Sequence, residues 1–374
     1  MKNFKARSES ALLAIFGTRP EAIKMCPLIL KFKELGIPVK ILLSGQHPHL
    51  AGEVLELFGL SADIVLNLKR EDSGLKSLTS ALLDALSPVI ESENPRAIIV
   101  HGDTCTAFCA SLLGFYSGRD VIHIEAGLRS GDMNNPYPEE FFRVCISKMA
   151  ALHLAPTESA AENLKSEGVC EGDIFVTGNT VIDALLYTDG NSFPLPFALP
   201  DSKTRVILLT AHRRESLDGA IFDTLTGVRD ALRKFEDCIL IFPYHKNPKA
   251  SAAAFEIFSD EGRAILCPPL SLFAFHRILR RADLVLTDSG GIQEEAAFLG
   301  KPTLVIRDNT ERRQCGTPSL RVIGRGRGDV YSEICALLSN PEKLKEMSVP
   351  SSAFGVGDAS QKIAEIIRKR YEFS

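Results

Sequence analysis

The sequence predicts an α/β protein made of two Rossmann-like domains, with a ligand-binding cleft between them. Three observations support this fold class. Short apolar segments alternate with longer helical patterns, as they do in a parallel, doubly wound sheet. The alternation lapses once, in a stretch rich in Pro, Gly, Ser and Asp, and then restarts. The chain has 374 residues, which is too long for one ordinary domain and fits two.

In the first half, each predicted strand is short and apolar and is followed by turn or polar residues. These buried strands are expected at residues 12–16, 39–44, 97–101, 121–125 and 152–156. Helical patterns between them include residues 51–59 and 77–92. Residues 189–205, DGNSFPLPFALPDSKTR, have no helical period, and we interpret them as the linker.

The second half repeats the same rhythm without repeating the sequence. Its strands are expected at residues 205–212, 238–245, 264–269, 282–289 and 302–308. Residues 359–373 have the period of a terminal amphipathic helix. We therefore predict an N-terminal domain over residues 1–185 and a C-terminal domain over residues 186–357, with a helix over 358–374 that packs back on the first domain.

Composition excludes several classes of protein. Hydrophobic residues make up 45% and charged residues 24%, so both cores can be large and no region is expected to be disordered. The net charge of −4 argues against a nucleic-acid partner. No apolar run is long enough to span a bilayer, and residues 11–17 suit a first strand better than a signal peptide, so no membrane partner is expected.

Cysteine usage points to a reducing compartment. The nine cysteines are scattered and include no C-x-x-C pair, so we interpret them as reduced, mostly buried thiols of a cytoplasmic protein. Cys105 and Cys109 are four residues apart on an expected helix, where core packing is a better explanation than a metal pair.

Carboxylates at the ends of predicted strands carry the strongest chemical signal. Glu125 ends an apolar strand, Asp103 follows another, and Glu139 and Glu140 open a helix after Pro138. Ligands of open α/β sheets bind outside the carboxyl ends of the strands. Acids gathered there are suited to proton transfer on a small molecule.

The second half contains a candidate phosphate site in ADLVLTDSGGIQEEAAFLG. Ser289, Gly290 and Gly291 are small residues at a helix start, where backbone N–H groups can face an anion. Glu295, about one turn later, is suited to accept hydrogen bonds from sugar hydroxyls. An ordinary βα turn explains the glycines about equally well, because such turns match by chance often.

The N-terminal FGTRPE segment offers a second anion site. Pro20 suits the first helical position, and Arg19 and Lys24 would then be cations beside a helix start, although a solvated surface is the commoner explanation for such cations. No G-x-G-x-x-G follows the first strand, which weakens a dinucleotide-binding interpretation.

Histidines recur at the ends of predicted strands, including His101. His212 and His245 lie beside polar loops, which favours a functional role, whereas His123 suits a structural role within its apolar strand. No pair of histidines shares a helical face with a glutamate, so a zinc hydrolase is disfavoured and no metal is expected.

Ten motifs in order resemble the bacterial non-hydrolysing UDP-N-acetylglucosamine 2-epimerases: FGTRPEAIKM, GQH, HGDT, IEAGLRSG, NPYPEE, TGNTVIDAL, TAHRRES, DSGGIQEE, GKP and RDNTER. The resemblance covers nearly the whole chain. It implies a fold similar to the GT-B glycosyltransferases, with the active site in the interdomain cleft and UDP mainly on the C-terminal domain. It also implies reversible epimerisation at C2 of UDP-GlcNAc to UDP-ManNAc, by anti elimination of UDP to 2-acetamidoglucal and syn re-addition, without a cofactor.

The same resemblance assigns roles to residues that match the family's motifs. The catalytic group comprises Asp103, Glu125 and Glu139 as acids, with His212 at the diphosphate. The substrate-binding group comprises Arg19, Lys24, Phe275 against uracil, the phosphate turn of Ser289, Gly290 and Gly291, Glu295 at the ribose, and Arg312. A regulatory site for UDP-GlcNAc as an allosteric activator would comprise Gln46, His47, Arg70, Glu140, Arg213 and His245. A UDP-sugar substrate and a homodimeric assembly are expected.

Several positions depart from the family pattern. They are Phe142, Leu270, Arg313, Gln314 and the segment 354–357. The departures bear more on the exact sugar and the regulatory site than on the chemistry. Four alternatives therefore stay open: an epimerase of a related modified UDP-sugar, a hydrolysing epimerase, a GT-B-like glycosyltransferase, and a UDP-sugar-binding regulator without turnover.

Overall fold

The computed structural model describes residues 10–189, 194–211, 220–244, 248–307 and 317–373. The chain divides into two compact units: unit 1 is Met1–Ala184 with Phe354–Ser374, and unit 2 is Leu185–Ala353. The sequence predicts this boundary between residues 185 and 186 and the return of the chain at residue 358.

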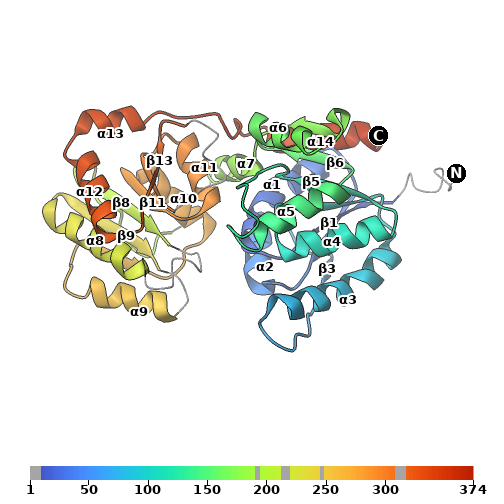
Figure 1. Cartoon of the computed structure of the whole chain (residues 1–374), viewed down its shortest axis with the longest axis horizontal. Coiled ribbons are helices and arrows are strands. Elements are labelled where there is room, and N and C mark those ends of the chain that lie inside the picture. The colour runs from blue at the N-terminus through green and yellow to red at the C-terminus, as the bar shows by residue number, and fades with distance from the viewer. Residues whose placement is uncertain (1–9, 190–193, 212–219, 245–247, 308–316, 374) are drawn as a thin grey trace. The chain divides into compact units, whose positions relative to one another are not determined.

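Unit 1 is built on one parallel sheet (Figure 1). Its described strands are β1 (Leu12–Phe16), β2 (Val39–Leu43), β3 (Ile64–Val65), β4 (Ala97–His101), β5 (Asp120–Ile124), β6 (Leu152–Ala155) and β7 (Ile174–Val176). They lie in the order β3-β2-β1-β4-β5-β6-β7. The described helices are α1 (Arg19–Glu34), α2 (Pro48–Leu57), α3 (Leu75–Glu93), α4 (Cys105–Tyr116), α5 (Glu139–Met149), α6 (Glu158–Ser166) and α14 (Ala359–Arg370). Helix α7 (Thr180–Tyr187) crosses the boundary between the units.

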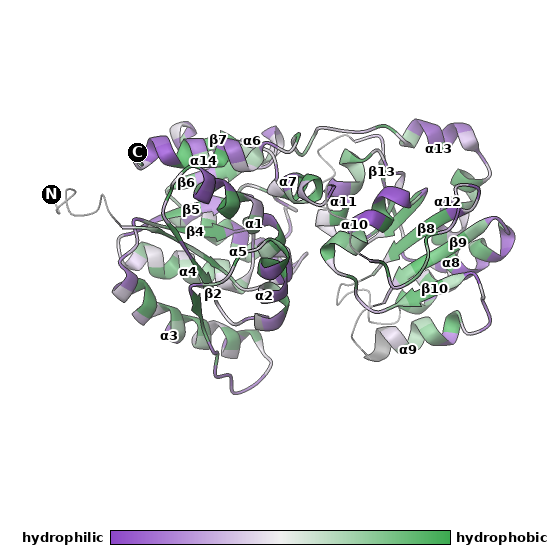
Figure 2. Cartoon of the chain, turned by 180° about the vertical axis from the view of Figure 1, so that it is seen from behind, coloured by the Kyte–Doolittle hydropathy of each residue, from purple (hydrophilic) through white to green (hydrophobic). Residues whose placement is uncertain are grey.

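Helices cover both faces of this sheet because its strands are apolar on both sides. Leu13 and Ile15 of β1 join a core with residues of α3, α4 and α5. Leu12, Ala14 and Phe16 alternate with them and are buried on the opposite face. The C-terminal helix α14 packs against α1. Figure 2 shows the resulting pattern, with hydrophobic strands inside and hydrophilic residues along the outer helices.

Unit 2 has a second parallel sheet. Its described strands are β8 (Arg205–Thr210), β9 (Cys238–Pro243), β10 (Ala264–Cys267), β11 (Leu284–Thr287), β12 (Thr303–Ile306) and β13 (Leu320–Ile323), in the order β10-β9-β8-β11-β12-β13. The described helices are α8 (Ala220–Lys234), α9 (Pro248–Ile257), α10 (Leu272–Arg281), α11 (Gly290–Phe298), α12 (Arg327–Leu338) and α13 (Pro341–Met347). One core packs α8, α9 and α12 on the sheet, and another packs α10 and α11.

The predicted α/β fold class with two parallel sheets is confirmed, with differences in detail. Strands β3, β7 and β13 are additional to those predicted. Helix α1 begins at Arg19, so Pro20 is its second residue, because the Thr18 side chain already accepts a hydrogen bond from the backbone N–H of Glu21 as the N-cap. No helix in the described part of the chain has the length and apolar character needed to cross a membrane.

Both sheets reverse their strand order at one place. In unit 1 the first strand β1 lies beside β4, and in unit 2 β8 lies beside β11. The chain leaves the two neighbouring strands toward opposite faces there, which opens a crevice at their carboxyl ends. Ligand-binding residues are therefore expected in the loops after these four strands.

Candidate active site

Glu125 follows β5, the strand next to the reversal point of unit 1. Its φ is 61°, a left-handed backbone conformation that residues other than glycine adopt at a cost of about 1–3 kcal/mol. One carboxylate oxygen, Oε2, accepts hydrogen bonds from Lys24 Nζ and, at 2.6 Å, from Asn179 Nδ2. The side chain of Glu125 is only 9% exposed. A strained acid with two fixed donors is typical of a functional site.

His101, the last residue of β4, lies beside this acid. Its Nε2 is 3.9 Å from Glu125 Oε2. Burial lowers the pKa of His101 to about 4, although the charge of Glu125 acts in the opposite direction. At neutral pH the imidazole is therefore uncharged, and Lys24 supplies the positive charge next to Glu125.

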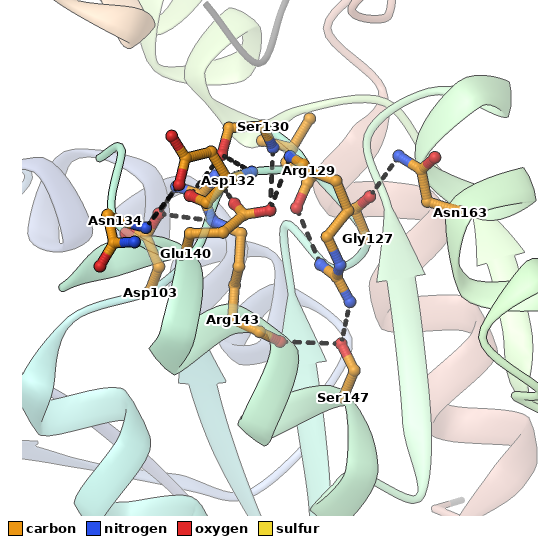
Figure 3. Close-up of polar contacts among 12 residues, drawn as sticks. Asp103, Gly127, Arg129, Ser130, Asp132, Asn134, Glu140, Arg143, Ser147 and Asn163 are labelled. Carbon is orange, nitrogen blue, oxygen red and sulfur yellow. Dashed lines mark hydrogen bonds and ion pairs between the residues drawn. The ribbon is translucent and has the colours of Figure 1, made fainter. Parts of the chain in front are cut away.

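Asp103 lies in the loop after β4 and is joined to helix α5 by an arginine (Figure 3). Arg143 Nε donates to Asp103 Oδ2 at 3.1 Å, and its Nη1 donates to Glu140 Oε2 at 2.9 Å. The Asp103 side chain is 29% exposed, whereas that of Glu140 is buried. Arg143 thus holds a solvent-accessible acid in a fixed direction.

Glu140 has a well-defined place inside unit 1. Its Oε1 accepts hydrogen bonds from the backbone N–H groups of Ser130 and Gly131 at 3.0 and 3.1 Å. These bonds fasten the loop after β5 to the start of α5. Glu139, its half-buried neighbour, is the first residue of the helix. The structure thus brings Asp103 and Glu140 together through Arg143, and Glu125 and Lys24 together by a direct contact.

Glu21, which the sequence did not single out, organises the loop that carries Arg19. Its Oε2 accepts from the backbone N–H groups of Gly17 and Thr18, and its Oε1 accepts from Thr104 Oγ1 at 2.7 Å. Burial raises the pKa of the Glu21 carboxyl. The side chain ties the loop after β1 to the loop after β4, so it fixes both sides of the crevice at the reversal point.

In unit 2, the Ser289-Gly290-Gly291 turn lies at the start of α11, directly after β11. Glu295, farther along α11, is buried and receives Nε2 of His276 at 3.2 Å from its Oε1. His276 is itself completely buried, and its Nδ1 is 2.9 Å from Thr188 Oγ1. Phe275, which is half-buried, precedes His276 on α10.

The described residues of the predicted regulatory set lie in unit 1. Gln46 is half-buried and accepts from Thr106 Oγ1 at 2.8 Å, and His47 is exposed, with its backbone N–H bonded to Gly17 O. Arg70 is exposed and donates to Gly74 O at 3.2 Å. His212, Arg213, His245 and Arg312, like Arg313 and Gln314, lie outside the described residues.

The only possible metal ligands that can be assessed are those of the described residues. Among these, no group of three or more His, Cys, Asp or Glu side chains is arranged to hold a metal ion. The Cys105 and Cys109 side chains are buried in the core of unit 1, on α4.

Comparison with known proteins identifies the family. The family model for UDP-N-acetylglucosamine 2-epimerase matches residues 31–368. The chain belongs to this family. It is 40% identical to the UDP-N-acetylglucosamine 2-epimerase of Bacillus subtilis over 368 residues, which cover 97% of this chain and 96% of that protein. The resemblance inferred from the ten motifs is therefore confirmed.

Solved structures of the family agree with the fold. The UDP-GlcNAc 2-epimerase of Neisseria meningitidis bound to UDP-GlcNAc is 35% identical, with a TM-score of 0.91 over 96% of this chain and 100% of that one. The S. aureus MnaA-UDP structure is 36% identical, with a TM-score of 0.89 and 97% of each chain covered. The fold is GT-B-like, with two Rossmann-like domains.

Proposed function

We propose that the protein interconverts UDP-GlcNAc and UDP-ManNAc by inverting C2 of the sugar. Membership of the family supports this activity, as do relatives whose structures hold UDP-GlcNAc or UDP. The observation that carries the mechanism is the pair of acids at neighbouring strand ends: Glu125 after β5, fixed by Lys24 and Asn179, and Asp103 after β4, fixed by Arg143.

The chemistry explains why acids without a redox cofactor suffice. The C2–H bond of an N-acetylhexosamine is not acidic, because no carbonyl group is adjacent to C2. Inversion becomes feasible when UDP leaves. In the elimination a base takes the C2 proton, the C1=C2 bond of 2-acetamidoglucal forms, and the electron pair of the C1–O bond goes to UDP. In the re-addition the UDP oxygen returns to C1, and an acid delivers a proton to the opposite face of C2.

The proposed roles of the residues follow from this sequence of steps. Glu125, Asp103 and Glu139 handle the protons at C2. Arg19, Lys24 and the predicted His212 stabilise negative charge as it develops on the leaving diphosphate. The N–H groups at the start of α11, from Ser289 to Gly291, bind phosphate oxygens, and Arg312 contacts the nucleotide. Glu295 binds the ribose, and Phe275 packs on the uracil.

Proton NMR in heavy water tests the reaction. We expect UDP-GlcNAc incubated with the protein to gain deuterium at C2 while signals of UDP-ManNAc appear. Epimer formation without label from the solvent would exclude the proton-transfer mechanism. Free N-acetylmannosamine as the main product would identify a hydrolysing epimerase, and binding without any change of the sugar would identify a regulator.

Substitution of the two acids tests their roles. Asp103→Asn and Glu125→Gln should each lower turnover by about a hundredfold or more, the scale of lost acid–base catalysis. UDP affinity, measured by calorimetry, should stay close to that of the wild type, because the proposed UDP contacts lie mainly in unit 2. Near-normal turnover of either variant would remove that residue from the mechanism.

Three further expectations stay predictions. The regulatory UDP-GlcNAc site would involve Gln46, His47, Arg70, Glu140, Arg213 and His245. The assembly is expected to be a homodimer, and the location cytoplasmic. Binding of a second equivalent of UDP-GlcNAc, and the mass of the particle in solution, are the measurements that address the first two.

A further inference from the structure

Asn179 directs its side-chain amide at the carboxylate of Glu125. The Nδ2 group lies 2.6 Å from Glu125 Oε2, and Oδ1 accepts a hydrogen bond from the backbone N–H of Val181 at 3.1 Å. A backbone N–H can only donate, so Oδ1 must face Val181 and the NH₂ group must face Glu125. The orientation of the amide is therefore determined by its partners.

The backbone of Asn179 is held by the C-terminal segment 354–360. The N–H of Asn179 donates to Phe354 O at 2.7 Å, and the N–H of Ser360 donates to Asp183 Oδ1 at 2.8 Å. The two chains touch through glycines, since a Cβ built on Gly178 would lie 3.0 Å from the Cα of Gly355. The last residues of unit 1 thus fasten the start of α7 at two points.

We propose that Asn179 is a positioning residue for Glu125, and that the C-terminal segment keeps Asn179 in place for this task. The inference rests on the proposed function, in which Glu125 transfers a proton at C2. Family membership does not assign this role to Asn179, and neither does its sequence position, 54 residues from its partner.

The geometry indicates why a second donor is needed. Proton transfer requires the acid to be held within about 0.5 Å and 10–20° of the productive arrangement. Lys24 ends in an ammonium group on a flexible stem, which neutralises charge but sets direction poorly. The planar amide of Asn179 is fixed at both ends, so it defines the direction of the carboxylate. Glu125 has a strained backbone, which gives it further need of such support.

Two substitutions separate positioning from helix capping. Asn179 precedes the first residue of α7 and caps it through Oδ1; Asn, Asp and Ser are about equally good N-caps. Asn179→Ser keeps an acceptor for Val181 but cannot reach Glu125. Asn179→Asp keeps the shape and the cap but sets a like charge against the carboxylate.

We expect kcat to fall about tenfold in Asn179→Ser and about a hundredfold in Asn179→Asp, with KM changed less than about threefold. The rate of deuterium incorporation at C2 should fall by the same factors. Melting temperatures should stay near that of the wild type in Asn179→Ser. A residue that acted only as a cap would leave all three proteins equally active, and that result would overturn the proposal.

Asn340 supplies the matched control. It caps α13 in unit 2 by accepting from the N–H groups of Glu342 and Lys343, and no hydrogen bond from its side chain to a carboxylate is found among the described residues. Asn340→Asp should keep full activity. If the wild type fails to epimerise UDP-GlcNAc, the proposed function fails. If it turns over and Asn179→Asp matches it, only the positioning role fails.

Discussion

Glu295 is the clearest case at the residue scale in which a buried partner prepares a proposed ligand contact. Its carboxylate is buried and receives His276, which is in turn bonded to Thr188. A carboxylate that is to bind both ribose hydroxyls must keep one orientation, because each hydroxyl donates in a defined direction. The chain Thr188–His276–Glu295 supplies this constraint from within unit 2.

Replacing His276 should therefore weaken recognition of the ribose. We expect His276→Phe to lower the affinity for UDP about tenfold, and to reduce the preference of the protein for UDP over 2′-deoxy-UDP. Calorimetry with both nucleotides measures the two quantities. Thr188→Val, which removes only the outer hydrogen bond, is the control and should have a smaller effect. An unchanged preference in His276→Phe would show that Glu295 does not depend on His276.

The candidate acids could be found in the sequence because each directly follows an apolar strand. Asp103 and Glu125 therefore stand at the edge of the sheet where ligands bind. Their partners could not be found in this way. Arg143 is 40 residues from Asp103, and Asn179 is 54 residues from Glu125. Nothing in the local sequence distinguishes Arg143 from other helical arginines or Asn179 from an ordinary helix cap, so only the fold brings these pairs together.

At the scale of elements, the central strands were predictable and the edge strands were not. Strands such as β1 and β4 are buried along their whole length and appear as continuous apolar runs. The three unpredicted strands, β3, β7 and β13, each lie at an edge of a sheet and are partly exposed. Edge strands are short and mix polar with apolar residues, so they lack the signal on which the prediction depends.

The contact between the C-terminal segment and the start of α7 makes a prediction at this scale. Gly355 has a φ of 108°, and a Cβ there would lie 3.1 Å from Gly178 Cα. Gly355→Ala should destabilise unit 1 by more than about 1 kcal/mol, because it adds backbone strain and a close contact. It should also lower kcat, since Phe354 holds Asn179.

Gly36 is the control for this substitution. It has a φ of 68° and open space around its Cβ position, so Gly36→Ala adds strain without a contact. Thermal unfolding and turnover of the two variants separate the effects. Equal turnover in both variants would show that the position of the C-terminal segment does not influence the active site.

At the scale of the whole molecule, the titrating groups with the largest consequences are buried histidines of unit 1. His101, His123 and His153 lie on the adjacent strands β4, β5 and β6. Burial lowers their pKa values to about 4, about 3 and about 4. They are uncharged in the folded protein at neutral pH, and His123 Nε2 is bonded to the backbone oxygen of Gly102 at 2.7 Å.

These shifts predict that stability falls as the pH is lowered from about 6.5 to about 4. Across that window the unfolded chain binds protons on these histidines that the folded chain does not, so the free energy of unfolding rises with pH. Each histidine contributes a slope of up to about 1.4 kcal/mol per pH unit. The buried carboxyls of Glu21 and Asp183, whose pKa values are raised by burial, act in the opposite direction.

Calorimetric unfolding between pH 7.5 and pH 5 measures this slope. We expect the melting temperature to fall steadily below pH 6.5, and His153→Leu to reduce the slope by up to about 1.4 kcal/mol per pH unit, because it removes one buried titrating group. His49→Leu, which removes an exposed histidine of α2, should leave the slope nearly unchanged. Hydrogen exchange should locate the loss of protection in β5 and β6 rather than in β8 and β11, because the three histidines all belong to the sheet of unit 1. A wild-type protein that is equally stable at pH 7.5 and pH 5, or equal slopes for the two variants, would show that these histidines do not govern acid stability.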